Sequence, residues 1–319
     1  MINILPGFLL AFVLAVIIGP FWIKFMIRVK AGQTVRSEGP ESHLKKTGTP
    51  QMGGFIFLIP TVVVSLFYIR EYPKILPILI LIIGFAAIGF IDDYIKVVLK
   101  RSMGLRAWQK MGLQIILCGV FYFLASRFTE LDLTMKVPFV SGMRLDLGIF
   151  AVPAMFFIII ATVNGTNFTD GVDGLSSSVT AVVATCITVA SLLAKGDIEP
   201  ISAIFLGGLL GYLVYNLFPA KIFMGDTGSL ALGGFVAGCA YMMELPLFIP
   251  IFGFIYLVEV ISVILQVTYF KATKGKRLFR MAPIHHHFEK GGWSETRVVG
   301  IFTITTVIMC VLALAGLWY

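Results

Sequence analysis

Two adjacent carboxylates, Asp92 and Asp93, follow an apolar run that is long enough to cross a lipid bilayer. If this run is a helix, both acids lie at its C-terminal end, where the helix dipole disfavours negative charge. Lys96 and Lys100 follow Asp92 at spacings of four and eight, which places the three side chains on one stripe of a helix. This arrangement has two equally good explanations. The charges could form ion pairs along the helix at a membrane boundary, or they could belong to a catalytic site.

Three further acids stand in short polar segments between apolar runs. Asp170 and Asp173 lie in the segment 164–174, which contains no Lys or Arg. Asp173 could cap a helix that begins at Leu175, but capping leaves Asp170 unexplained. Asp226 precedes another apolar run, where it could cap that helix or ligate magnesium, which commonly takes one or two protein carboxylates together with substrate phosphate.

Polar residues also interrupt the C-terminal third of the chain. Glu259 and Gln266 are seven residues apart, on one face of an apolar run. An acid at that depth indicates either a functional site or a hydrogen bond between packed helices. His285, His286 and His287 follow a basic loop. Three consecutive histidines cannot all face one metal from a helix, and magnesium prefers oxygen, so we expect them to hydrogen-bond phosphate or sugar.

A basic segment near the N-terminus, 42–54, combines Lys45 and Lys46 with the glycine pair Gly53 and Gly54. Such residues let backbone N–H groups and ammonium groups approach phosphate oxygens closely. A turn that grips lipid headgroups would have the same composition. The segment therefore predicts a phosphate contact without deciding between a substrate and a lipid.

The elements that must position these residues are membrane helices. Of the 319 residues, 58% are hydrophobic and only 13% are charged, which is typical of a polytopic membrane protein. The net charge of +8 could indicate nucleic acid, but the chain has no soluble basic domain to bind it, so we expect no nucleic-acid partner. The four cysteines lie singly in apolar runs and show neither disulfide nor zinc spacing.

Apolar runs and helix breakers predict a single membrane domain over residues 1–319, with ten spans. The expected spans are 6–27, 52–69, 75–95, 109–125, 148–163, 174–194, 200–218, 229–244, 246–270 and 297–318. Placing both termini outside puts 19 of the 25 Lys and Arg residues on the cytoplasmic side, as the positive-inside rule requires. Residues 127–147 alternate between polar and apolar and predict a short β-hairpin on the outer side.

This topology places the acids at the span ends on one face of the membrane, with lysines and histidines among them. One site explains their arrangement better than a separate structural reason for each. Carboxylates and cations beside lipid predict magnesium-assisted chemistry on a phosphate whose other end stays in the bilayer.

Five groups of residues, taken in order, resemble the motifs of the polyprenyl-phosphate N-acetylhexosamine-1-phosphate transferases, and among them the phospho-N-acetylmuramoyl-pentapeptide transferase (MraY) family. These groups are Ser42 to Gly54, Asp92-Asp93-Tyr94, Asn167 to Gly174, Phe223 to Ser229 and Pro283 to Glu289. The resemblance covers nearly the whole chain. It implies an all-α integral protein of the bacterial plasma membrane with ten transmembrane helices, a cytoplasmic active site and commonly a homodimer.

The resemblance implies transfer of phospho-MurNAc-pentapeptide from UDP-MurNAc-pentapeptide to undecaprenyl phosphate, with Mg²⁺ as cofactor and lipid I and UMP as products. It implies that Asp226 binds the metal and that Asp92, Asp93 and Asp226 are catalytic. The implied substrate contacts are Lys46 at the nucleotide, Lys96, Lys100 and Asn216 at the phosphates, Phe168, Asp170, Asp173 and Phe223 at the uridine, and His285, His286 and His287 at the sugar phosphate, with Asn167 and Gln266 completing the set.

Two other functions compete with this one. A related enzyme could transfer GlcNAc-1-phosphate to the same lipid. A transporter could use buried acids as ion relays, but its site is expected near the bilayer midplane, whereas these acids collect at one edge. The chemical step also has two possible routes, direct attack by the lipid phosphate or a covalent intermediate on an Asp.

Overall fold

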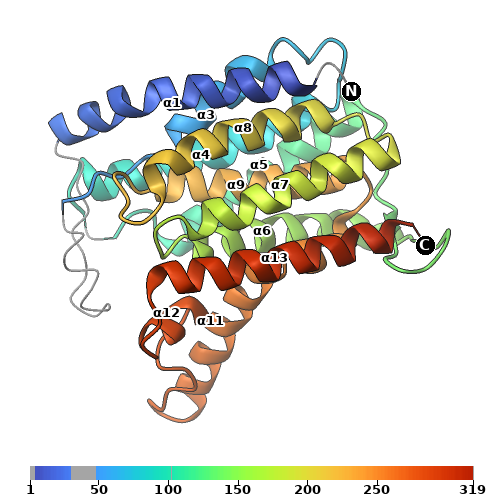
Figure 1. Cartoon of the computed structure of the whole chain (residues 1–319). Helices are drawn as coiled ribbons and strands as arrows, with labels where there is room; N and C mark the ends of the chain where they lie inside the picture. Colours follow the sequence, from blue (N-terminus) through green and yellow to red (C-terminus); the bar gives the residue numbers. More distant parts are fainter. Residues whose placement is uncertain (1–3, 30–47, 102, 319) are drawn as a thin grey trace.

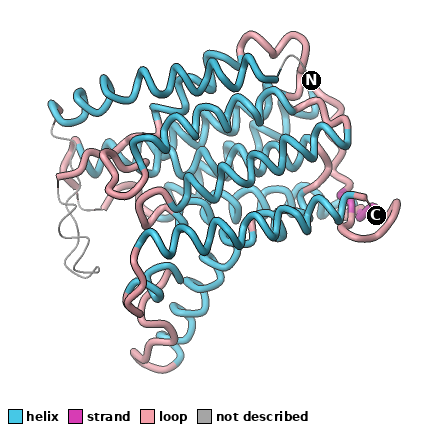
Figure 2. Tube along the Cα trace, viewed as in Figure 1, coloured by secondary structure: helices cyan, strands magenta, loops and turns pink. Residues whose placement is uncertain are grey.

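The computed structural model describes residues 4–29, 48–101 and 103–318, and it shows a bundle of long helices (Figure 1). The longer helices are α1 (Ile4–Arg28), α3 (Phe55–Ser65), α4 (Ile75–Val97), α5 (Ala107–Phe128), α6 (Ala151–Thr169), α7 (Leu175–Ala194), α8 (Glu199–Asn216), α9 (Gly225–Met242), α11 (Phe254–Ala272) and α13 (Glu295–Leu317). The short ones are η1 (Gly148–Phe150), η2 (Pro246–Phe248), α10 (Ile249–Phe252) and α12 (Ile284–Glu289). Helix dominates the whole trace in Figure 2.

Seven helical segments in the described part of the chain are long and apolar enough to cross a membrane. They are Ile4–Arg28, Ile75–Val97, Ala107–Phe128, Gly148–Thr169, Leu175–Ala194, Phe254–Ala272 and Glu295–Leu317. The chain is therefore an all-helical integral membrane protein of several spans. The ten-span count and the outward position of both termini remain predictions.

Two of the predicted spans differ from the observed helices. The span expected over 52–69 contains only the eleven-residue α3, because the chain leaves the helix in a series of turns after Ser65. The span expected over 246–270 is broken into η2, α10 and α11. Pro246 and Pro250 cannot donate backbone hydrogen bonds, and Gly253 ends α10 and precedes α11. The new helix can therefore start in a different direction.

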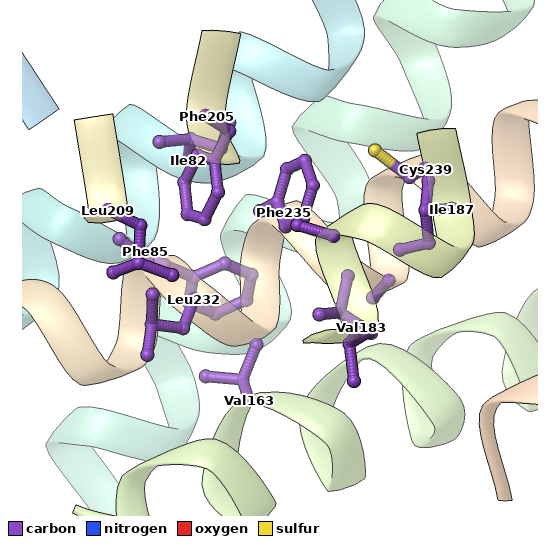
Figure 3. Packing of buried hydrophobic residues seen from close by; sticks show 14 of the residues in the cluster. Ile82, Phe85, Val163, Val183, Ile187, Phe205, Leu209, Leu232, Phe235 and Cys239 are labelled. Atoms are coloured by element: carbon purple, nitrogen blue, oxygen red, sulfur yellow. The ribbon is translucent and has the colours of Figure 1, made fainter. Parts of the chain in front are cut away.

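Helix α9 forms the centre of the bundle. Every residue from Thr227 to Met242 is buried, and the hydrophobic core contains side chains from α4, α6, α7 and α8 around it (Figure 3). The glycines of α9 allow this close packing: a Cβ at Gly233 would lie 2.3 Å from the Cα of Val163 in α6. On another side of α9, the rings of Phe235 and Phe205 stack with centroids 3.9 Å apart.

The segment between α5 and α6 contains a small antiparallel hairpin, β1 (Met135–Lys136) and β2 (Arg144–Leu145), with Met135 opposite Leu145. Each strand has two residues, which is shorter than the alternating pattern suggested. The hairpin contacts the end of α13, because Lys136 Nζ donates to the Leu317 carbonyl at 2.8 Å. It lies near the C-terminus at the right of Figure 1. We call this region the hairpin end.

Helices α11 and α12 extend from one side of the bundle (Figure 1). In α11 only Ile255, Tyr256, Glu259 and Ser262 are buried, and all four lie in its first half. The chain then turns back through a basic loop to α12, which lies at the opposite end of the bundle from the hairpin. The C-terminal ends of α4 and α6 and the start of α9 lie at this same end.

Candidate active site

Three carboxylates meet where α4 ends and α9 begins. Asp92, Asp93 and Asp226 each offer an oxygen, and these three atoms lie within 4.8 Å of one another. Asp92 and Asp93 are buried, whereas the side chain of Asp226 is 19% exposed. We call these three residues the carboxylate cluster. The sequence prediction that acids from distant segments meet in one place is consistent with this geometry.

Glycine brings the two helices close enough to form the cluster. A Cβ at Gly89 of α4 would lie 2.0 Å from the backbone oxygen of Asp226, so any side chain at position 89 would force the helices apart. Gly225 begins α9 with a φ of +74°, a conformation that other residues rarely adopt. Both glycines are therefore needed to place Asp226: Gly89 allows α4 to approach it, and Gly225 allows the backbone to turn into α9 just before it.

Asp93 caps the start of α9 from a different helix. Its Oδ1 accepts a hydrogen bond from the backbone N–H of Asp226 at 3.0 Å. Its Oδ2 accepts from the backbone N–H of Thr227 at 2.8 Å and from the Thr227 hydroxyl at 2.6 Å. These N–H groups have no partner within α9. The alternative that Asp226 is itself the cap is wrong, because α9 has no side-chain cap hydrogen bond at its N-cap residue, Met224.

Two lysines neutralise part of this charge. Lys110 Nζ lies 2.9 Å from Asp226 Oδ2, and Lys96 Nζ lies 3.3 Å from the same oxygen. Lys96 also forms an ion pair with Asp92. Lys110 was not among the predicted site residues. Its signal in the sequence was a cation near the start of the span expected over 109–125.

Backbone and amide groups complete the surroundings of the cluster. Asn167 Nδ2 donates to Asp226 Oδ1 at 3.0 Å and to Ser229 Oγ at 2.8 Å. The backbone N–H of Leu105 donates to Asp92 Oδ1 at 2.7 Å. Asn167 therefore joins the cluster as a predicted site residue, and the loop before α5 closes over Asp92.

The turn between α6 and α7 carries the next two predicted residues. Burial, and to a smaller extent the nearby carboxylates of Asp226, Asp93 and Asp173, together raise the pKa of Asp170 to about 8. Asp173 Oδ2 accepts a hydrogen bond from the backbone N–H of Ala220 at 2.9 Å. The capping explanation for Asp173 is wrong, because the N-cap of α7 is Gly174 without a side-chain hydrogen bond. Asp173 instead connects two loops.

The three histidines of α12 point to different partners. His285 is fully buried, and its Nδ1 lies 3.0 Å from Glu259 Oε1. His286 Nδ1 lies 2.6 Å from Glu289 Oε2. His287 Nδ1 accepts from the backbone N–H of Arg280 at 3.1 Å. Of the three, His285 packs against the α6–α7 turn, because a Cβ at Gly171 would lie 2.2 Å from its Nε2.

Two predicted phosphate contacts do not reach the cluster. Lys100 follows the end of α4 at Val97 and has a φ of +51°, so the prediction that it shares a helical stripe with Asp92 and Lys96 is wrong. Asn216 is buried, with its Oδ1 accepting from Ser177 Oγ at 2.9 Å and its Nδ2 donating to the Ile222 carbonyl at 3.0 Å. Its amide holds the loop before α9.

The remaining predicted residues lie around the site or beyond the described chain. Phe168 is 36% exposed, at the end of α6. The backbone N–H of Phe223 donates to the Pro50 carbonyl at 2.9 Å, which joins two loops. Gln266 Oε1 accepts from the backbone N–H groups of residues 278 and 279 at 3.1 and 2.9 Å, so its amide orders the basic loop. Lys46 lies outside the described residues.

The donor set of the cluster suits a hard divalent cation. Carboxylate oxygens are the ligands that Mg²⁺ prefers, and Asp226 is the most exposed of the three acids. The ammonium groups of Lys96 and Lys110 lie at the same oxygen, so cation and lysine would share it. The residues present therefore fit a magnesium ion held on Asp226 with substrate oxygens.

Comparison with known proteins adds independent information. Residues 75–244 match the glycosyl transferase family 4. The chain is 47% identical to the phospho-N-acetylmuramoyl-pentapeptide-transferase of Acetivibrio thermocellus, over 99% of this chain and 96% of the relative. It is 45% identical to the protein of that name from Clostridium kluyveri, over 99% and 100% of the two chains. The corresponding protein of Caldicellulosiruptor bescii is 44% identical, over 98% and 97%.

Proposed function

Because the chain belongs to the phospho-N-acetylmuramoyl-pentapeptide transferase family, we infer that it transfers phospho-MurNAc-pentapeptide from UDP-MurNAc-pentapeptide to undecaprenyl phosphate. The products are lipid I, a precursor of peptidoglycan, and UMP. The acceptor is a membrane lipid, and a protein with several apolar helices long enough to cross a bilayer suits it. The observation that carries this function is the close likeness over nearly the full length of the chain.

The reaction joins two anions. An oxygen of undecaprenyl phosphate attacks the phosphorus that bears the sugar, and a new P–O bond forms. The bond from that phosphorus to the bridging oxygen breaks, and UMP leaves with the electron pair. The protein must therefore mainly neutralise and align charge. Lys96 and Lys110, which lie 3.3 and 2.9 Å from Asp226 Oδ2, can pair with phosphate oxygens at this place.

Magnesium is the proposed cofactor, with Asp226 as its protein ligand and Asp92 nearby. A bound Mg²⁺ supplies charge neutralisation and orientation of the diphosphate. Asp93 is less free to act, since both of its oxygens already accept hydrogen bonds from Asp226 and Thr227. We assign Asp93 to holding the start of α9, and with it Asp226, in place.

Direct attack by the lipid phosphate is the proposed route. A phosphate oxygen is already a nucleophile and needs little activation, so a covalent intermediate on an Asp is unnecessary. Asp92 is the proposed acceptor for any proton on the lipid phosphate, because its carboxylate lies beside Lys96 and has fewer hydrogen bonds than that of Asp93. Rapid quenching of a single turnover tests this: a sugar phosphate covalently bound to the protein would contradict the direct route.

The decisive experiment is UMP release by the purified protein supplied with undecaprenyl phosphate and each of two donors. We expect UDP-MurNAc-pentapeptide to be used and UDP-GlcNAc not to be used. The cations between Lys271 and Arg280 suit an extended anionic peptide better than a small neutral sugar. Higher catalytic efficiency with UDP-GlcNAc would contradict the donor assignment. Transport without UMP release would favour the transporter alternative.

The site is proposed to face the cytoplasm, on the basis of the asymmetry of the basic residues. Ser141 at the hairpin end and Lys276 in the basic loop are both exposed. Single cysteines at these positions, in a background that lacks the four native cysteines, should label from opposite sides of intact cells. Labelling from the same side would contradict the topology. A homodimer is also proposed, from the family resemblance, and light scattering of the protein in detergent tests it.

A further inference from the structure

Two titratable side chains lie completely buried outside the carboxylate cluster. Glu259 of α11 and His285 of α12 both have no solvent exposure, and His285 Nδ1 lies 3.0 Å from Glu259 Oε1. Their other polar atoms, Glu259 Oε2 and His285 Nε2, have no hydrogen-bond partner among the described residues. Burying four polar atoms and satisfying only two of them costs folding free energy. A contact that served only to join two helices would not need ionisable groups.

Burial restricts the charge that this pair can carry. A carboxylate beside a neutral imidazole would leave one uncompensated charge in a fully enclosed place, which is strongly unfavourable. A carboxylate beside an imidazolium is neutral as a pair and makes the contact a charge-assisted hydrogen bond. A carboxylic acid that donates to Nδ1 is also neutral. Both neutral arrangements place a hydrogen on Nε2, at the far side of the ring.

The direction of Nε2 connects the pair to the site. Nε2 faces Gly171, in the turn between α6 and α7, and only the absence of a side chain makes room for it, since a Cβ there would lie 2.2 Å away. Asp170 and Asp173 flank this glycine. The ring of His285 also lies next to that of His286, with centroids 4.1 Å apart. The orientation of one buried imidazole thus affects both α12 and the turn.

We propose that Glu259 is a positioning residue for the transfer reaction. Its contact with Nδ1 holds the imidazole of His285 with an N–H directed at the turn 170–174. Directed at Gly171, this N–H fixes the place of the turn between Asp170 and Asp173, which are the predicted uridine contacts. This inference rests on the proposed function, because it assigns Glu259 a part in that reaction. The contrasting explanation is a hydrogen bond that only stabilises the junction of α11 and α12.

A kinetic comparison separates the two explanations. Glu259→Gln removes the ionisable carboxyl group and keeps the volume. Tyr256→Phe is the matched control, because Tyr256 lies one turn earlier in α11, is only 2% exposed, and makes a 2.8 Å hydrogen bond to Thr180 away from the turn 170–174. We expect Glu259→Gln to lower kcat/KM for UDP-MurNAc-pentapeptide by about 10- to 100-fold, as losses of orienting partners do elsewhere. We expect Tyr256→Phe to change it by less than about threefold, with a comparable fall in apparent Tm.

A spectroscopic measurement tests the geometry without relying on activity. The chain has four histidines, so ¹⁵N-histidine labelling of the protein in nanodiscs gives few imidazole signals, and His285→Gln assigns one of them. We expect a hydrogen on Nε2 of His285 in the wild-type protein, a changed signal in Glu259→Gln and an unchanged signal in Tyr256→Phe. An Nε2 without hydrogen in the wild-type protein would overturn the proposal.

The failures of the two proposals are distinguishable. If the wild-type protein releases no UMP, the transfer function fails, while the labelling still decides the state of His285. If the wild-type protein is active and Glu259→Gln matches Tyr256→Phe in kcat/KM, the positioning role of Glu259 is contradicted, while the proposed transfer function stands. Should Glu259→Gln not fold, Gly171→Ala provides the test, because its methyl group displaces the ring and leaves Glu259 intact. Wild-type kcat/KM in Gly171→Ala would then overturn the proposal.

Discussion

The two ends of the bundle hold charge in opposite ways. At the hairpin end, Arg144 pairs with Asp132 at 3.2 Å and with Glu244, and all three side chains are between 37% and 47% exposed. At the other end, the carboxylate cluster pairs with Lys96 and Lys110 in a place where Asp92 and Asp93 are almost fully enclosed. Both ends form ion pairs between segments that are far apart in the sequence. They differ in how much water reaches them.

This difference indicates what each set of charges is for. Exposed pairs contribute up to about 1 kcal/mol each and are easily exchanged for other surface residues. Buried charges cost desolvation energy that their attraction often fails to recover, so stability alone does not favour them. Three carboxylates and two lysines at a helix junction therefore indicate chemistry, whereas the hairpin pairs serve only to fasten a loop. Each prediction below tests one side of this contrast.

The largest expected effect is that of Asp226→Asn. The substitution leaves two carboxylates facing two lysines, so the cluster becomes neutral, and we expect the protein to remain folded. Turnover should fall by at least about a hundredfold, since the proposed metal ligand is lost. UMP release and apparent Tm measure the two effects. Asp132→Asn at the hairpin end is the control and should keep nearly full turnover. Near-wild-type turnover in Asp226→Asn would make the cluster a structural feature.

A smaller loss is expected from Lys110→Met. This change removes the ammonium group that lies 2.9 Å from Asp226 Oδ2 and leaves three carboxylates with Lys96 alone. We expect kcat/KM to fall by roughly tenfold or more. We also expect added Mg²⁺ to raise the apparent Tm of the variant more than that of the wild type, since an ion then compensates the unpaired charge. Lys136→Met, which removes a contact to a backbone carbonyl at the hairpin end, should show neither effect.

Asp170→Asn should change stability in a way that depends on pH. Burial and, to a smaller extent, the neighbouring carboxylates raise the pKa of Asp170 from its usual 3.8 to about 8, so the folded state binds its proton more tightly than the unfolded state does. The stability that this proton contributes is complete below the unfolded pKa and is lost as pH rises toward 8. Asparagine cannot ionise, so the variant should gain apparent Tm over the wild type by a few degrees between pH 5 and pH 8, measured with EDTA present. Parallel Tm profiles for the two proteins would contradict the shifted pKa.

Part of this contrast could be predicted from the sequence. Long apolar runs predict helices because few other structures satisfy the backbone in lipid, and successive antiparallel helices return Asp92 and Asp226 to the same end of the bundle. The number of crossings between these two acids is enough to place them at the same end, whereas their contact also requires α4 and α9 to be neighbours. Asn167 was predicted as a substrate contact only through the family resemblance, and its hydrogen bond to Asp226 was not predicted.

The remaining contacts depend on which helices are neighbours and on where each one stops. Lys110 meets Asp226 only because α5 starts beside α4 and α9, and periodicity does not encode this adjacency. Lys100 left the predicted stripe because α4 ends three residues earlier. The family resemblance implies a phosphate contact for Asn216, and the sequence did not predict that its amide hydrogen-bonds the Ile222 carbonyl. Such details follow from packing between segments that are distant in the sequence.

The smallest expected effect tests the hairpin end itself. Arg144→Ala removes both exposed ion pairs, and we expect an apparent Tm loss equivalent to about 1 kcal/mol or less, with unchanged turnover.

The pKa of Asp132 is lowered by a hydrogen bond from the backbone of Thr134 and also by Arg144. A lowered folded pKa contributes stability that is present above the unfolded pKa and is lost as pH falls through the folded pKa. Acidification below about pH 4 should therefore narrow the Tm difference between Arg144→Ala and the wild type, and high salt at neutral pH should narrow it too. If Arg144→Ala instead lowered turnover as much as Lys110→Met does, exposure would not separate structural from chemical charges in this protein.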